Sequence, residues 1–137
     1  FLCDRQLDSL KVFTVLKFME WMIIDEKQTA TRVKRYEIPK LRRLLQKGEP
    51  AVLGLVRVRG VQSPTQNHQV LAVGYELDPA LEQISIYLYD PNHPHLNPFI
   101  RFFMGKNAAA PLFIQSTGEP LFGFFVIPYR YQEPPHP

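Results

Sequence analysis

Two residues with complementary proton chemistry flank an expected β-hairpin in the middle of the chain. His68 opens one strand-like segment and Asp90 closes the next, and each stands eleven residues from Pro79 in the loop between them. If the hairpin is symmetric about Pro79, these side chains oppose each other, with Cβ atoms about 4.5–5.5 Å apart. A carboxylate beside an imidazole fixes its tautomer and stabilises the protonated ring. The spacing therefore predicts half of a proton-transfer site.

The strand that ends at Asp90 carries an apolar face. Ile84, Ile86 and Leu88 alternate along it and share the face of Asp90. Gly74, within the preceding strand, predicts a bulge or the close approach of another group. We therefore expect an acidic group at the end of a buried surface.

Helical patterns precede these strands. Residues 25–35 are polar, and we expect a connection there with a short strand near 31–36. Pro39 and Gly48 bracket a second helix over residues 39–47. A first helix is expected over residues 7–23, with Val12, Val15 and Trp21 widening an inner face of Leu7, Leu10, Phe13, Leu16, Met19 and Ile23.

Strands follow the helices along the chain. Expected strands cover residues 51–58, 68–76, 83–90, 99–103 and 121–129, whereas the segment 106–115 fits no single pattern. This order favours an α+β fold in which N-terminal helices pack on a mostly antiparallel β-sheet. A chain of 137 residues builds one core, so we expect a single domain with a tail from about residue 130.

Composition excludes several classes of protein. No run of about 18 apolar residues occurs, so we expect no contact with a membrane. The net charge of +3 comes without a nucleic-acid motif, so we expect no nucleic acid partner. A cluster of basic residues forms either a solvated helix face or a site for an anionic partner. It comprises Arg32, Lys34, Arg35, Lys40, Arg42, Arg43 and Lys47.

The hairpin resembles the second half of papain-like cysteine peptidases, in the segments NHQVLAVGYE and ISIYLYDPNHP. It is closest to the group related to the bacteriocin-processing peptidase domains that cleave double-glycine leaders. In that group a histidine opens one strand as H-x-V-x-x-x-G-Y and an Asp-Pro dipeptide closes the next. The resemblance covers about residues 48–129. It implies a papain-like fold and hydrolysis of a peptide or protein substrate by a thiol, without a cofactor.

The resemblance also implies roles for individual residues. His68 matches the general base, and Asp90 matches the acid that orients it. Asn92 is a rival for the orienting role, because other papain relatives use an asparagine. Asp90 is preferred because the hairpin symmetry places it on the face of His68.

The nucleophile is the open question. Cys3 is the only cysteine, and it stands just before the first expected helix, where a helix dipole favours thiolate. Its surroundings, FLCDRQL, lack the glycine-containing context of the family, and no glutamine precedes it. Three alternatives remain: the nucleophile lies upstream of Phe1 in a longer protein, Cys3 is the nucleophile of a shortened enzyme, or Cys3 is a small apolar residue of a non-enzyme.

The competing class is a non-catalytic interaction or structural module in which His68 and Asp90 form a hydrogen-bonded strut. An incomplete domain would expose apolar surface on the first helix, so we also expect a homo-oligomer or a partner chain. Asp90, His93 and His95 could ligate a metal, but no fourth ligand stands at a diagnostic spacing. We therefore expect no metal.

Overall fold

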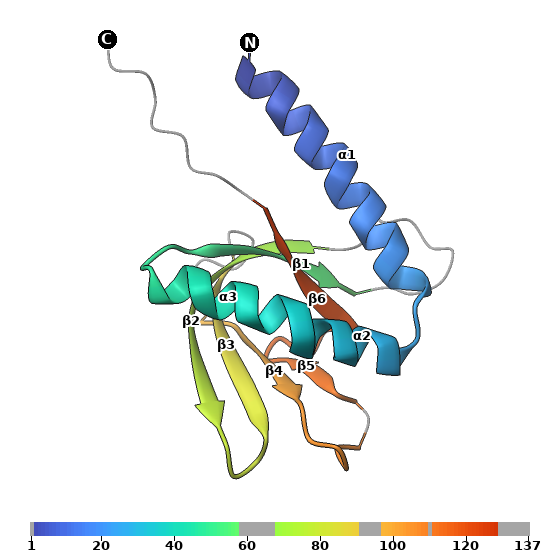
Figure 1. Cartoon of the computed structure of the whole chain (residues 1–137), viewed down its shortest axis with the longest axis vertical. Coiled ribbons are helices and arrows are strands. Elements are labelled where there is room, and N and C mark those ends of the chain that lie inside the picture. Colours follow the sequence, from blue (N-terminus) through green and yellow to red (C-terminus); the bar gives the residue numbers. More distant parts are fainter. Residues whose placement is uncertain (1, 58–67, 91–96, 110, 129–137) are drawn as a thin grey trace.

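The computed structural model describes residues 2–57, 68–90, 97–109 and 111–128, with side chains from residue 12 onward. Two helical segments pack on a six-stranded antiparallel sheet, so the chain has the expected α+β fold (Figure 1). The elements are α1 (Leu2–Ile23), α2 (Glu26–Arg32), η1 (Val33–Glu37), α3 (Ile38–Gln46), β1 (Ala51–Val56), β2 (His68–Asp78), β3 (Gln83–Tyr89), β4 (Phe99–Phe103), β5 (Phe113–Gln115) and β6 (Gly123–Ile127).

The sheet curls around its own core. Its strand order is β5-β4-β3-β2-β1-β6, and neighbouring strands run antiparallel. Phe113 on β5 and Phe124 on β6 lie on the two edge strands, yet their ring centroids are only 6.1 Å apart. The register places on one concave face a set of almost fully buried side chains, Leu53, Leu55, Ile84, Ile86, Ile100, Phe102 and Phe124.

One long helical segment runs beside β6, and its C-terminal part packs over the concave face of β1 and β2. It comprises α2, η1 and α3, and it begins where the side chain of Asp25 accepts a hydrogen bond of 2.8 Å from the backbone N–H of Gln28. The predicted connection over residues 25–35, with its short strand, is therefore wrong. Its buried positions recur every fourth residue, at Thr29, Val33, Glu37 and Leu41. Thr29 and Glu37 are polar, so a search for apolar residues at helical spacing does not detect this pattern.

Pro39 lies inside this segment rather than at its start. The π-helical turn η1 comes directly before α3, and a wider turn accommodates the proline ring, which would otherwise clash with the carbonyl four residues earlier. Gly48 follows the helix end as expected, with a φ of 78°. Its N–H donates to the carbonyl of Leu45, and that of Glu49 donates to Leu44, each at 3.0 Å.

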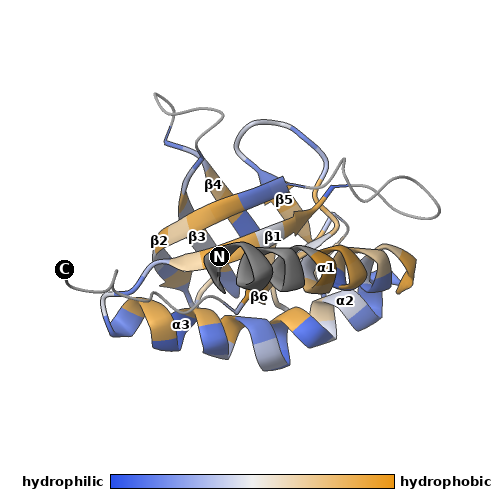
Figure 2. Cartoon of the chain, turned by 90° about the horizontal axis from the view of Figure 1, so that it is seen from above, coloured by the Kyte–Doolittle hydropathy of each residue, from blue (hydrophilic) through white to orange (hydrophobic). Residues whose placement is uncertain are grey.

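The first helix, α1, packs on the convex face of β1 and β6. The rings of Phe18 and Trp21 lie 4.9 and 5.5 Å from the ring of Phe125, measured between centroids. The predicted inner face is wrong at Phe13, Leu16, Met19 and Ile23, because the buried positions are Thr14, Phe18, Trp21 and Met22. Trp21, expected to widen that face, is buried as predicted, and the side chains of Leu7 and Leu10 lie outside the described part of the chain. Apolar residues therefore remain on the surface of α1 (Figure 2), at Val12, Phe13, Val15, Leu16, Met19 and Ile23.

Gly54 on β1 allows α1 to pack closely against the sheet, because it has no side chain. A Cβ atom at this position would lie 2.7 Å from Cζ of Phe125 and 2.9 Å from Cζ of Phe18.

We expect Gly54→Ala to lower the free energy of unfolding by about 1–3 kcal/mol, because both rings must move. Urea denaturation measures the change. Gly74→Ala is the matched control, since its new Cβ would lie 3.8 Å from Cδ2 of Tyr87, the nearest atom beyond its own chain neighbours. Equal losses in both variants would contradict the packing argument.

An ion pair joins α1 to α2. Nη1 of Arg32 lies 2.6 Å from Oε1 of Glu20, and this hydrogen bond holds the pKa of the Glu20 carboxyl below its ordinary value of 4.5. A lowered carboxyl pKa stabilises the fold above the unfolded-state pKa, and this contribution is lost as the pH falls through the folded-state pKa.

Removal of this carboxylate should therefore have a pH-dependent effect. At pH 7 we expect Glu20→Gln to lower the free energy of unfolding by less than about 1 kcal/mol, because both side chains are more than a third exposed. The difference should vanish in acid, where the native carboxyl is protonated. Urea denaturation of both proteins over a series of pH values measures it, and a difference that stays constant in acid would refute the assignment.

Candidate functional site

His68 and Asp90 lie together at one end of the concave face. Nε2 of His68 is 3.0 Å from Oδ1 of Asp90, which is a hydrogen-bonding distance. The histidine side chain is 16% exposed and that of the aspartate 8%. The proximity expected from the hairpin is therefore present, and the pair is largely shielded from water.

The register that produces this contact differs from the expected one. The turn occupies residues 79–82, so Asp78 pairs with Gln83 and the hairpin is not symmetric about Pro79. Continued unchanged, this register would place Leu71 opposite Asp90. His68 would then lie on the other face of the sheet, because side chains alternate along a strand.

A bulge at Val73 corrects the alternation. Ala72 and Gly74 pair with successive residues of β3, so Val73 is an extra residue and the register moves by one. Beyond the bulge, His68 shares the face of Asp90 and reaches it diagonally rather than from the directly opposed position. The bulge predicted near Gly74 is confirmed, and it is the feature that aims the histidine.

Regular sheet structure supports both side chains. The backbone of His68 pairs with Leu55 of β1, near the end of that strand. Asp90 follows β3 directly, and the N–H of Leu88 donates a hydrogen bond of 2.9 Å to the carbonyl of Pro98. The segment before β4 is thereby held beside the end of β3. A pair supported in this way keeps its geometry without rearrangement of the backbone.

The hydrogen bond determines what the imidazole can do. When Asp90 accepts the Nε2 proton, the neutral ring carries its acceptor lone pair on Nδ1. A proton taken up at Nδ1 would give an imidazolium that the carboxylate stabilises. A carboxylate that fixes the tautomer of an imidazole in this way is the arrangement expected of a general base and its orienting acid.

The other predicted site residues are not brought to this pair by the described structure. Asn92, His93 and His95 lie outside the described residues. Cys3 lies within the first turn of α1 rather than before the helix, since α1 begins at Leu2, and its side chain is outside the described part. Figure 1 shows the N-terminal half of α1 projecting beyond the sheet.

Glu37 is a buried acid that the sequence did not single out. Its Oε1 accepts a hydrogen bond of 2.9 Å from the backbone N–H of Val126, and its Oε2 lies 3.6 Å from Nζ of Lys40. The available signal was its place in the four-residue stripe of the long helix. A carboxylate on that stripe points into the core, where it needs a partner.

Two tyrosines of the hairpin have shifted pKa values in opposite directions. The hydroxyl of Tyr75 accepts hydrogen bonds of 3.3 Å from Arg42 and Gln46, and the bond from Arg42 chiefly lowers its pKa. The hydroxyl of Tyr87 donates to Glu76 at 2.7 Å, which raises its pKa. Tyr75 thereby ties β2 to α3, whereas Tyr87 braces the two strands of the hairpin.

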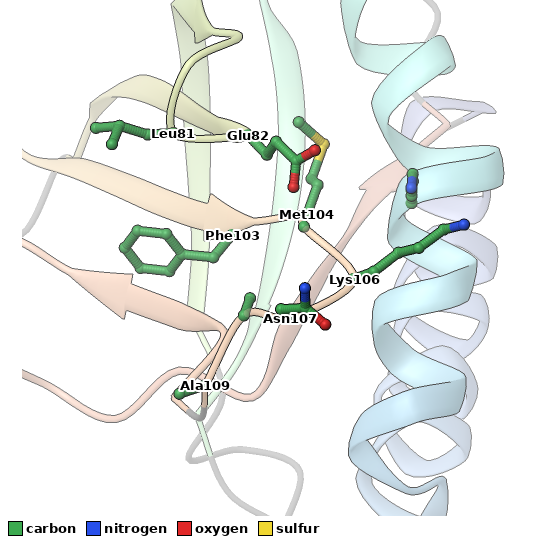
Figure 3. Close-up of a pocket in the computed structure, with 10 residues that line it drawn as sticks. Leu81, Glu82, Phe103, Met104, Lys106, Asn107 and Ala109 are labelled. Carbon is green, nitrogen blue, oxygen red and sulfur yellow. The ribbon is translucent and has the colours of Figure 1, made fainter.

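A hollow of about 610 Å³ lies at the turn end of the hairpin (Figure 3). Glu82 from the β2–β3 turn and Met104, Lys106 and Asn107 from the β4–β5 loop line it. These residues belong to the opposite end of β3 from Asp90. The hollow is therefore a separate feature and not part of the His–Asp site.

Comparison with known proteins leaves the family open: no family model, no curated protein and no solved structure matches the chain. Within residues 2–57, 68–90, 97–109 and 111–128, no three His, Cys, Asp or Glu residues group as metal ligands. None of the described helices combines the length and the apolar character needed to cross a membrane. The papain-like resemblance thus remains a prediction from the residues of the hairpin.

Proposed function

We propose that this domain carries the base and orienting acid of a papain-like acyl-transfer site that acts on a peptide or amide bond. One observation carries the proposal, the shielded hydrogen bond of 3.0 Å between His68 and Asp90. The sequence motif also supports the proposal, because a histidine begins one strand and an Asp-Pro dipeptide follows the next, as in the papain-like group.

The proposed reaction follows from the chemistry of the pair. His68 takes a proton from a thiol, and Asp90 stabilises the resulting imidazolium. The thiolate attacks the carbonyl carbon, and the imidazolium returns the proton to the leaving amine. Water then releases the acyl group and regenerates the thiol. Cys3 is the only thiol of the 137 residues, but it lies on α1, which packs on the face of the sheet opposite to the pair. A thiol from outside these residues therefore fits the proposed reaction better.

Loss of the base should abolish most of the activity. In the full-length protein we expect His68→Gln to lower kcat/KM for fluorogenic peptide amides by about 10²–10⁴-fold, the usual contribution of a general base. Asp90→Asn should also lower it, because the neutral amide stabilises the imidazolium less. His136→Gln, in the C-terminal nine residues, is the control. Full activity in a folded His68→Gln protein would refute the proposal.

Alkylation distinguishes the source of the thiol. If Cys3 is the nucleophile, its rate of reaction with iodoacetamide should show an inflection below about pH 8.5, the value of an ordinary thiol. His68→Gln should move that inflection back to the ordinary value. An unshifted profile in the parent protein would exclude Cys3 as the nucleophile. The role of His68 and Asp90 would then be tested by the hydrolysis experiment alone.

A second candidate function rests on the surface of α1. Six large apolar side chains there are 39% to 74% exposed, and contiguous apolar surface of this kind marks a contact with another protein. We propose, as the alternative, an interaction module that forms a homo-oligomer or binds a partner chain through α1. In that case the His–Asp hydrogen bond is a structural strut.

Charge placed on α1 should disrupt self-association. Sedimentation velocity of the parent chain should show an oligomer at micromolar concentration if α1 pairs with a second copy. We expect Leu16→Glu with Met19→Glu to convert it to a monomer, because two carboxylates cannot be buried in an apolar contact. Gln28→Glu, exposed on α2, should leave the oligomer intact. A parent chain that stays monomeric at every concentration would count against self-association.

A further inference from the structure

A groove of about 500 Å³ opens between α1 and α3, with the edge strand β6 as its floor. Phe13 and Trp21 of α1 form one wall and Leu44 of α3 lies in the other, while residues 125–128 form the floor. His68 and Asp90 are not among the lining residues. The groove is therefore a second, mainly apolar site that the proposed reaction does not use.

The rim of the groove is basic. Four cations line it, namely Lys17, Lys40, Arg43 and Lys47, against the single carboxylate of Glu37. That carboxylate is already engaged by Val126 and Lys40. Within the part of the chain that the structure describes, neither Arg43 nor Lys47 forms an ion pair. Two cations on an apolar groove thus create a local positive potential without an internal counter-charge.

The fold separates these cations from the rest of the basic cluster in the sequence. Arg32 pairs with Glu20 of α1, and Arg42 donates to the hydroxyl of Tyr75. Both serve contacts within the domain. The charges left on the groove follow one side of α3, at Lys40, Arg43 and Lys47.

The outer edge of β6 is poorly suited to strand addition. The N–H of Val126 is occupied by Glu37, and Pro128, at the end of the floor, has no N–H to donate. An incoming segment would therefore be recognised by side chains and not by a backbone ladder. Apolar anchors and carboxylates are the groups that match this lining.

We propose that the groove between α1 and α3 binds an acidic protein segment with bulky apolar side chains. The apolar side chains lie against Leu44 and Pro128, which are the more accessible apolar residues of the lining, and the carboxylates pair with Arg43 and Lys47. Phe13, which is 39% exposed, extends the contact onto the apolar surface of α1, so the occupant covers more area than a small ligand. This binding is independent of the proposed acyl transfer and does not need a nucleophile.

The test is a selection of peptides from a random library displayed on phage, with the whole chain as the target. We expect the enriched peptides to combine Asp or Glu with Leu, Phe or Trp. Fluorescence polarisation of one enriched, labelled peptide then measures its Kd. Arg43→Glu with Lys47→Glu should raise this Kd by roughly 10-fold or more, as expected for two exposed ion pairs replaced by repulsions.

Two further double variants test whether the change in Kd comes from the charges at the groove. Acidic residues near the end of α3 oppose the helix dipole, so Arg43→Gln with Lys47→Gln is included as a milder pair, and it should also weaken binding. Lys27→Glu with Arg35→Glu makes the same change in net charge outside the groove and should leave the Kd within about twofold.

Several outcomes would overturn the proposal. They are the absence of enriched peptides, enrichment of neutral or basic peptides, and an equal loss of affinity in the Lys27 and Arg35 control. Dodecanoate that binds more tightly than the peptide and displaces it would identify the groove as a site for a small amphiphilic carboxylate instead.

Discussion

Burial of both faces of one part of the sheet is the constraint on which this fold depends. Strands β1 and β6 carry side chains of the concave core on one face, while α1 packs on the other. Gly54 permits this arrangement, because the rings of Phe18 and Phe125 occupy the space of its missing side chain. The long helix closes the concave side through Val33 and Leu41. The remaining strands extend from this doubly covered part and curl until β5 approaches β6.

The position of the His–Asp pair is a consequence of one extra residue in the sheet. Val73 shifts the register of β2 against β3, and everything before it in β2 changes face. His68 thereby joins the apolar face that ends in Asp90, instead of pointing away from it. His68 begins β2 and pairs with Leu55 of β1, whereas Asp90 directly follows the last residue of β3. Such rigid placement suits both proton transfer and a structural strut.

Charge is distributed on the long helix according to what each turn contacts. Arg32 and Arg42 serve contacts with α1 and β2. Farther along, Lys40, Arg43 and Lys47 face the groove over β6, where the buried carboxylate of Glu37 is committed to the sheet edge. The domain thus has two chemically distinct regions, a His–Asp pair near the junction of β1, β2 and β3 and a basic, apolar groove beside β6.

The sequence by itself determined the features that depend on local chemistry. The α+β class, the strand over 99–103, the helix end at Gly48 and the bulge beside Gly74 all followed from composition, alternation and glycine placement. Tertiary structure decided what depends on contacts between distant segments. It selected Phe18 and Trp21 as the buried side of a helix that is apolar on several sides, because only that side meets Phe125. It made a helix of residues 26–37, in which the carboxylate of Glu37 finds its partner, the N–H of Val126, only in the folded chain. The contact between His68 and Asp90 was expected from a symmetric hairpin, yet it arises from a longer turn and a bulge together, and no count along the chain reveals both.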